Sequence, residues 1–172
     1  IPDTIEIIGD GFFSALDGLE ELVIPASVKF SEDNYKSFDN MESLKKITFL
    51  GNIYNLADNI SDKLESVTIY GSVKYIFGSA FENSTSLKSF KILGSIEERP
   101  NFVSGIGGRA FKNCTSLEEF VFPKKADSFL RKNKKKENAG AKKLHCSLFV
   151  LCDEGKNMLD FFVNLTIKFS FI

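Results

Sequence analysis

The sequence contains five copies of one short apolar pattern, and this repetition constrains the fold more than any other feature. Each copy has three apolar residues, the second three positions after the first and the third two positions after the second. The five trios are Leu19/Leu22/Ile24, Leu44/Ile47/Phe49, Leu64/Val67/Ile69, Leu87/Phe90/Ile92 and Leu117/Phe120/Phe122. The last two members of each trio have the alternation of a β-strand. One strand of this length cannot bury its apolar side, so we expect the copies to stack in parallel around one core.

The spacing between copies indicates the class of repeat. The leading leucines are separated by 25, 20, 23 and 30 residues. A period of about 20–29 residues with an L-x-x-L-x-L core is typical of leucine-rich repeats. The sequence therefore predicts a leucine-rich-repeat solenoid.

A second apolar element precedes most copies. An isoleucine lies five residues before a phenylalanine in three of them, and Ile60 takes the place of the phenylalanine in the shortened third copy. The pairs are Ile8/Phe13, Ile76/Phe81 and Ile106/Phe111. We expect these phenylalanines to stack along the convex side, which accounts for much of the chain's 18 Phe without an aromatic ligand site.

Two phrases resemble the BspA-like leucine-rich repeats. The phrase I-P-x-T-I-x-x-I-G-x-x-x-F runs from Ile1 to Phe13, and A-F-x-N-C-T-S-L runs from Ala110 to Leu117. The resemblance implies a right-handed superhelix with a parallel β-sheet on the concave side, and short strands, turns and short helical turns on the convex side. It also implies a cell-surface or secreted protein of bacteria or protists, implicated in adhesion. It supplies no catalytic residues and no cofactor.

The resemblance ends before the chain does, which predicts three segments. Residues 1–123 form an array of about five repeats, interrupted by an insertion over 97–105; residues 124–143 form a basic linker or helix; residues 144–172 form a degenerate strand or cap, or a poorly ordered end. The array holds 11 Lys/Arg against 18 Asp/Glu, a net charge of −7, whereas residues 124–172 hold 11 against 5, a net charge of +6. The Ile1-Pro2 start falls inside a repeat, so we expect a fragment or a mature piece of a longer chain.

The last 49 residues suggest two further expectations. Nine of the 20 residues in 124–143 are basic. This composition suits a solvated loop or helix, or else a nuclear-localisation or phosphate-binding patch. Phe129 is the only aromatic residue there, so we do not expect nucleic-acid binding. Residues 159–172 are too few to span a membrane as a helix. Their alternating apolar residues predict a half-buried strand that pairs with the last repeat, or a poorly ordered end.

Candidate catalytic and metal groups are sparse. His145, Cys146 and Cys152 have a spacing that is unusual for zinc, and no fourth ligand is evident. Because His145 is the only histidine, a His-based triad on the repeats is excluded. The Gly-rich segment 104–109 lacks the Lys-Ser/Thr of a phosphate loop. Gly78 aligns with Gly108, so we expect these glycines to serve a turn that needs positive φ.

Four Asn-x-Ser/Thr triplets are either glycosylation acceptors or structural turns. They begin at Asn59, Asn83, Asn113 and Asn164. Asn83 and Asn113 hold the same repeat position, where asparagine is expected to serve a turn. Cys114 aligns with Ser84 and is interpreted as a small buried residue.

The best functional lead is the outer face of the stacked strands. Parallel register would align a column of alternating charge, Glu20, Lys45, Glu65, Lys88 and Glu118. The next columns would face the concave side. They supply the candidate partner contacts Lys46, Thr48, Leu50, Ser66, Thr68, Tyr70, Ser89, Lys91 and Leu93, with Tyr70 as the expected anchor.

We therefore expect a non-enzymatic module that binds a protein partner through this concave sheet at a cell surface. The alternative is an intracellular scaffold whose basic segment 124–143 contacts an acidic partner. A solvated sheet face without a partner is the simplest reading of the same residues.

Overall fold

The computed structural model describes residues 1–2, 4–9, 11–14, 16–30, 38, 41–56, 60–96, 109–123 and 168–171, and it contains ten strands within them. The strands are β1 (Ile7–Ile8), β2 (Glu21–Ile24), β3 (Lys29–Phe30), β4 (Lys46–Phe49), β5 (Ile53–Leu56), β6 (Ser66–Ile69), β7 (Val73–Ile76), β8 (Ser89–Ile92), β9 (Glu119–Phe122) and β10 (Lys168–Phe171).

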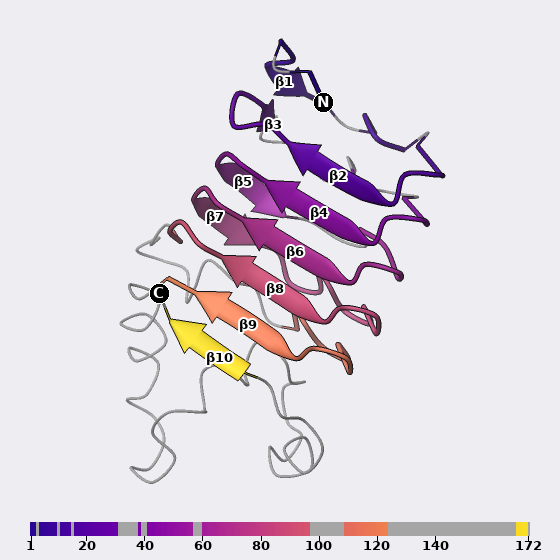
Figure 1. Ribbon diagram of the computed structural model, residues 1–172, viewed down its shortest axis with the longest axis vertical. Helices are drawn as coiled ribbons and strands as arrows, with labels where there is room; N and C mark the ends of the chain where they lie inside the picture. The colour runs from indigo at the N-terminus through magenta and orange to yellow at the C-terminus, as the bar shows by residue number, and fades with distance from the viewer. Residues whose placement is uncertain are drawn as a thin grey trace, which may run out of the picture.

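The main sheet has six strands in the order β10-β9-β8-β6-β4-β2, all parallel (Figure 1). The register is the one that the apolar trios predict, since Leu22, Ile47, Val67, Phe90 and Phe120 are aligned across the sheet. A shift of one residue would turn every buried side chain to the solvent, so the alternation fixes this register.

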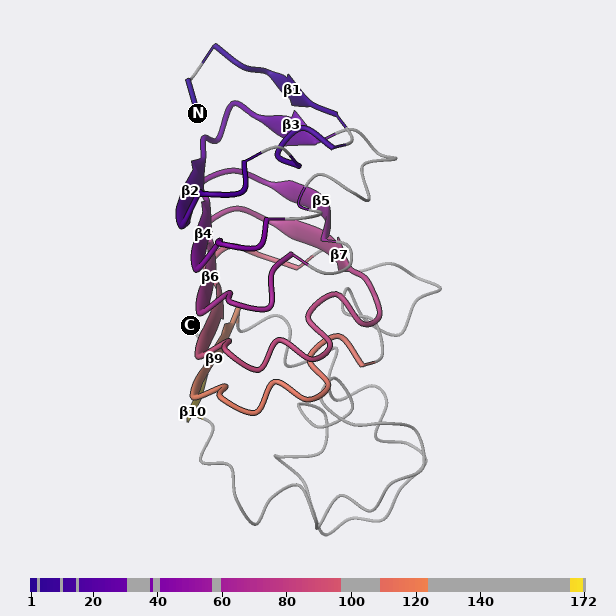
Figure 2. The same cartoon turned by 90° about the vertical axis from the view of Figure 1, so that its right-hand side faces the viewer.

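A second wall of short strands faces the main sheet. β1 pairs with β3 and β5 pairs with β7, again in parallel, and an isolated bridge joins Val73 to Ile96. Seen from the side, the short strands lie behind the main sheet, and the chain passes from one wall to the other in each repeat (Figure 2). These stacked parallel strands, one turn of the chain per repeat, form a leucine-rich-repeat solenoid, which confirms the predicted fold class.

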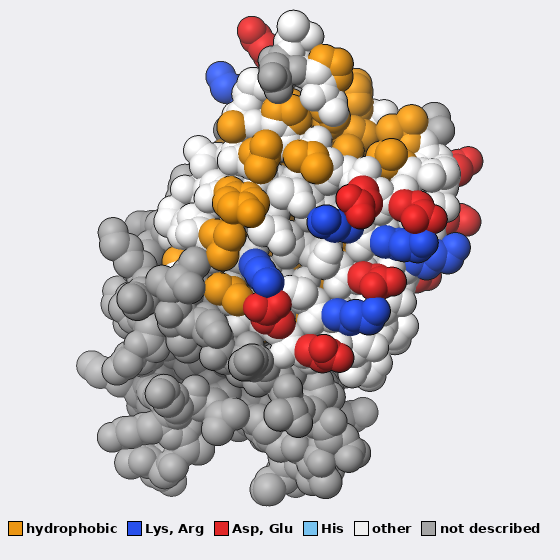
Figure 3. Space-filling view, viewed as in Figure 1, with side chains coloured by type: hydrophobic (Ala, Val, Ile, Leu, Met, Phe, Trp, Pro, Cys, Tyr) orange, Lys and Arg blue, Asp and Glu red, His pale blue; other side chains and the backbone are white. Residues whose placement is uncertain are grey.

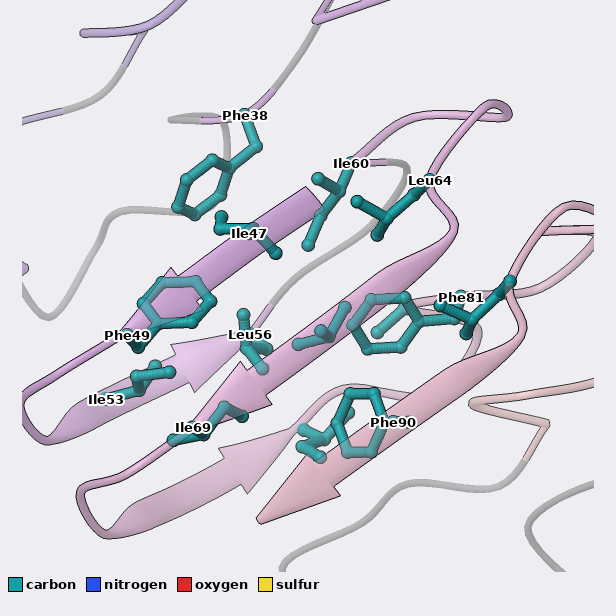
Figure 4. Close-up of a cluster of buried hydrophobic side chains, with 14 of the residues drawn as sticks. Phe38, Ile47, Phe49, Ile53, Leu56, Ile60, Leu64, Ile69, Phe81 and Phe90 are labelled. Atoms are coloured by element: carbon teal, nitrogen blue, oxygen red, sulfur yellow. The ribbon is translucent and has the colours of Figure 1, made fainter. Parts of the chain in front are cut away.

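The apolar core fills the space between the two walls (Figure 4). The phenylalanine stack predicted for the convex side is confirmed: Phe13 stacks on Phe38 with ring centroids 5.4 Å apart, and Phe81 stacks on Phe111 at 5.1 Å. Ile60 is buried at the equivalent place in the shortened copy. Of the leading leucines, only Leu19 in the first copy is partly exposed.

The convex side contains turns but no helix within the described residues, so the short helical turns expected there are absent from that part of the chain. In the first repeat, successive i→i+3 hydrogen bonds reach the carbonyls of Gly11, Phe13 and Leu16. Among the described residues these bonds do not run over consecutive donors, so the turns there do not continue as a helix.

The turn before Phe13, Phe81 and Phe111 has positive φ, but one residue later than expected. Gly11, Ser79 and Arg109 hold equivalent positions and have φ values of 69°, 66° and 63°. Gly78 does not have positive φ, so the expectation for that glycine is wrong, and Gly108 lies outside the described residues. The repeat therefore fixes the conformation at this position even where the residue is not glycine, at some cost in backbone strain.

Three glycines that follow the main-sheet strands have a steric role. A Cβ added to Gly51 would lie 2.8 Å from the Cα of Ala26, and a Cβ on Gly71 or Gly94 would overlap the carbonyl of the glycine in the preceding turn. Backbones therefore pass here at a distance that leaves no room for a side chain. Next to them, the Ser72 N–H donates to Asn52 Oδ1 at 2.8 Å, and the Ser72 and Ser95 hydroxyls are hydrogen-bonded at 2.7 Å.

The main sheet does not end at the last copy of the pattern, because β10 pairs with β9. Phe169 is aligned with Phe120 and Phe171 with Phe122, so the alternating residues near the chain end form the strand that the sequence offered as one of two outcomes.

Phe111→Ala should lower the free energy of unfolding by about 3–5 kcal/mol, because the side chain is fully buried and contacts three other aromatic rings. Urea unfolding followed by circular dichroism would measure the loss. Phe12→Ala is the matched control, since Phe12 is exposed and should lose much less. Equal losses in the two variants would contradict the phenylalanine stack.

Gly71→Ala should lower the free energy of unfolding by about 1–3 kcal/mol, because the new Cβ has to displace the backbone of the neighbouring turn. Gly18→Ala is the control, since nothing lies within 4 Å of its added Cβ. A thermal melt in which Gly71→Ala is as stable as Gly18→Ala would contradict the close approach of the two turns.

Candidate functional site

The outward side of the main sheet, here called the sheet face, carries the residues singled out from the sequence (Figure 3). The backbone pairing aligns Lys46 with Ser66 and Ser89, and Thr48 with Thr68 and Lys91. Hydrogen bonds from Leu50, Tyr70 and Leu93 to the preceding strands continue the same register beyond the strand ends. The nine candidates therefore lie on one continuous surface, formed by β4, β6 and β8 and by the residues that follow them.

The flank at the amino ends of the strands carries paired charges. Lys45 Nζ lies 2.9 Å from Glu20, and Lys88 Nζ lies 2.8 Å from Glu65. The side-chain hydrogen bond with Glu20 raises the pKa of Lys45, and the one with Glu65 raises the pKa of Lys88. The hydrogen bond with Lys88 lowers the pKa of Glu65. Because these groups are exposed to water, the ion pairs contribute little to the free energy of folding. They shape the pattern of charge on the sheet face and favour the observed strand register.

Two lysines among the candidate contacts are also paired across strands. Lys91 Nζ lies 2.7 Å from Glu119 Oε2, and the hydroxyl of Ser89 donates to the same oxygen at 3.0 Å. Lys46 Nζ lies 3.6 Å from Glu21. A partner that used these ammonium groups would have to share them with carboxylates already present.

An apolar column follows the carboxyl ends of the strands, consisting of Pro25, Leu50, Tyr70 and Leu93. Tyr70 is 54% exposed and Leu50 45%, whereas Leu93 and Pro25 are half-buried. Apolar side chains gather over this end of the strands in Figure 3, and the charges gather over the other end. The backbone beneath the column is held by ladder bonds, including Tyr70 N–H to the Phe49 carbonyl at 2.9 Å.

Two valines at the same repeat position differ in exposure. The strand alternation places both Val23 and Val121 on the outward side of the sheet. Val23 is 48% exposed on β2 and adds an apolar group to the sheet face, as expected, whereas Val121 on β9 is buried. On the second wall, Lys74 Nζ lies 3.7 Å from the centroid of the Tyr54 ring, a cation–π contact between β5 and β7.

The two described Asn-x-Thr triplets have a structural role in the convex turns. Asn83 and Asn113 both have positive φ, and Asn113 Nδ2 donates to Asn83 Oδ1 at 2.7 Å. Asparagine tolerates this conformation better than most residues. Asn59 and Asn164 lie outside the described residues.

Cys114 is buried between the same two turns, which confirms its interpretation as a small buried residue. Its Sγ donates a hydrogen bond to the Phe81 carbonyl at 3.0 Å. Burial raises the pKa of this thiol to about 12, so it stays protonated at neutral pH and is a poor nucleophile.

Within the described ranges, no group of three His, Cys, Asp or Glu side chains could hold a metal ion. Three groups of residues singled out from the sequence lie outside those ranges. They are His145, Cys146 and Cys152, residues 104–108 of the Gly-rich segment, and the whole basic segment 124–143. Among the residues that the structure places, no helix has the length and apolar character needed to cross a membrane.

Comparison with known proteins agrees with the geometry. The model of the BspA type leucine rich repeat region matches residues 1–101 and 98–133, in six copies. Neither a curated protein nor a solved structure matches the chain significantly. Because the matched repeats cover well over half of its length, the chain belongs to the BspA-type leucine-rich repeat family.

Proposed function

We propose that this chain is a non-enzymatic protein-binding module that uses its sheet face at a cell surface. The observation that carries the proposal is the exposed apolar column beside a field of paired charges, supported by membership of a repeat family whose surfaces generally mediate protein interaction. The contact residues are Lys46, Thr48, Leu50, Ser66, Thr68, Tyr70, Ser89, Lys91 and Leu93.

Tyr70 is the proposed anchor of the interface. Its ring is more exposed than Leu50, and its backbone is held by the ladder bond to β4 and by the close-packed glycine that follows it. A tyrosine on a rigid backbone offers a large contact area and one hydroxyl while losing little conformational entropy on binding. The hydroxyls of Thr48 and Thr68, both half-buried, lie beside it in the next column and offer hydrogen bonds to a partner.

The paired charges favour a partner whose contact surface carries little net charge. Four lysines and five glutamates lie along the described part of this face, and four Lys–Glu pairs join them. Since each ammonium group already has a carboxylate neighbour, binding depends on apolar contacts and neutral hydrogen bonds more than on net charge. A partner that is a highly charged polymer fits this face poorly.

Family membership supports a surface or secreted setting with adhesion as the role, because such repeats are typically found there. The basic segment 124–143 favours the alternative of an intracellular scaffold with an acidic partner. Protease shaving of intact source cells, with a cytosolic protein as the control, distinguishes the two settings. Cleavage of the chain while the control stays intact supports the surface, whereas full protection supports the scaffold.

Tyr70→Ala should weaken binding of the labelled chain to intact cells or matrix proteins by roughly 30-fold, since a hot-spot residue contributes at least about 2 kcal/mol. The melting temperature should stay nearly unchanged because Tyr70 is largely exposed. Tyr54→Ala is the matched control, because Tyr54 is a partly exposed tyrosine on β5 of the second wall and lies away from the sheet face. Equal binding by the Tyr70 variant and the parent chain would remove Tyr70 as the anchor.

A further inference from the structure

We propose that the protein partner lays one amphipathic α-helix along the apolar column of the sheet face, across the strands. This inference rests on the proposed function and names the element of the partner that the sheet face receives. It uses the three interior members of the column, Leu50, Tyr70 and Leu93. They follow β4, β6 and β8, each of which has a neighbouring strand on both sides (Figure 1).

The column lies across the strands because its members hold the same repeat position. Tyr70 N–H donates to the Phe49 carbonyl at 2.9 Å and Leu93 N–H to the Ile69 carbonyl at 2.8 Å, so both residues keep the register of the strand ladder. Successive members are therefore about 4.8 Å apart, the distance between neighbouring strands. The charges gather over the other end of the strands (Figure 3), so a rod parallel to the strands would leave the apolar groups and meet the ion pairs.

An α-helix is the regular structure whose same-face residues match this spacing best. Apolar residues at i, i+4 and i+7 recur about every 3.5 residues, which at about 1.5 Å per residue is a step of about 5.3 Å. The step differs from the strand spacing by only about 0.5 Å, which side chains absorb over three contacts. Same-face residues of an extended peptide recur about every 6.7 Å, so such a peptide is out of step with the column within two repeats.

A polyproline II helix is the other regular structure with a related spacing. Its turn of about three residues is about 9.3 Å long, close to twice the distance between neighbouring strands. Proline-rich segments of this kind dock in grooves lined by aromatic side chains. The column has one aromatic residue, Tyr70, between two leucines. Aliphatic groups on both sides of a tyrosine suit the apolar face of an α-helix better than a row of proline rings.

The side of the column that faces the strands offers two hydroxyl groups and one lysine. Thr48, Thr68 and Lys91 are aligned there, and all three are half-buried. Lys91 is paired with Glu119 at 2.7 Å, so it adds little net charge. A helix on the column would therefore turn short neutral residues, such as serine, threonine or alanine, toward the strands.

The other side of the column is formed by bare backbone. The glycines that directly follow its members are Gly51, Gly71 and Gly94. Neighbouring turns pass so closely there that no side chain fits, so none rises beside the column at these positions. A helix is about 10–12 Å wide with its side chains. The glycines give it the clearance to bring its apolar face into contact with Tyr70 and the two leucines.

The exposure of the column sets the length of the helix. Tyr70 is 54% exposed and Leu50 45%, Leu93 and Pro25 are half-buried, and Pro123 at the next position is buried. The accessible members from Pro25 to Leu93 therefore extend over about 14 Å. A helix of about 10 residues, or roughly three turns, spans that length.

Selection of random peptides on phage against the 172-residue chain tests the inference. Peptides of about 16 residues are long enough to form three turns and their ends. A counter-selection against Tyr70→Ala keeps only the peptides that need the sheet face. Labelled synthetic copies are then titrated with the parent chain and with Leu50→Ala and Leu93→Ala, and Tyr54→Ala on the second wall is the control. A thermal melt of each variant shows that it is folded.

The selected peptides should carry apolar residues every three or four positions, with short neutral residues beside them. Circular dichroism should show that they gain helix on binding. A central proline should weaken them by at least roughly tenfold, because it breaks the helix. Leu50→Ala and Leu93→Ala should weaken binding by about 3–10-fold, less than Tyr70→Ala, because the tyrosine is the anchor. Tyr54→Ala should bind as the parent chain does.

Two kinds of result would overturn the helix. The first is a set of Tyr70-dependent peptides that are proline-rich, that alternate with a period of two, or that keep their affinity with a central proline; the sheet face would then still bind a partner, in another form. The second is a selection that yields no Tyr70-dependent peptide. Failure of the proposed function is seen separately, if cells and matrix proteins bind the Tyr70→Ala variant as well as the parent chain.

Discussion

The contacts on which this array depends join residues that hold the same position in neighbouring repeats. Phenylalanine stacks on phenylalanine, lysine pairs with glutamate, and asparagine donates to asparagine across neighbouring copies. The turns after the main-sheet strands approach so closely that Gly71 and Gly94 leave no room for a side chain. This close contact between backbones fixes the spacing of neighbouring repeats. The parallel register, the core and the arrangement of the sheet face all depend on that spacing.

The parts of the fold that follow from alternation could be predicted from one sequence. The trios predicted the register of β2, β4, β6, β8 and β9, because an error of one residue would expose the whole apolar set. The second wall was only partly foreseen. Ile53 and Leu56 form β5, but they belong to the shortened copy, where no phenylalanine marks the position.

The misplaced features depend on backbone geometry more than on side-chain pattern. Gly78 aligns with Gly108, which suggested positive φ there, but the turn requires it one residue later, at Ser79 and Arg109. The recurrence of Gly51, Gly71 and Gly94 two residues after the last apolar position was a visible signal of close approach. For the candidate site, the sequence predicted which residues share a face, but not that Lys46, Ser89 and Lys91 interact with glutamates on it.

The local pairing of charges on the sheet face has a consequence for the kinetics of recognition. Long-range attraction speeds association when a surface has a strong potential of one sign, and a field of alternating pairs cancels that potential within a short distance. A partner would then reach this face by diffusion without steering, at rates of about 10⁵–10⁶ M⁻¹s⁻¹. A long-lived complex would accordingly need slow dissociation from the apolar column, or several copies of the face engaged at once.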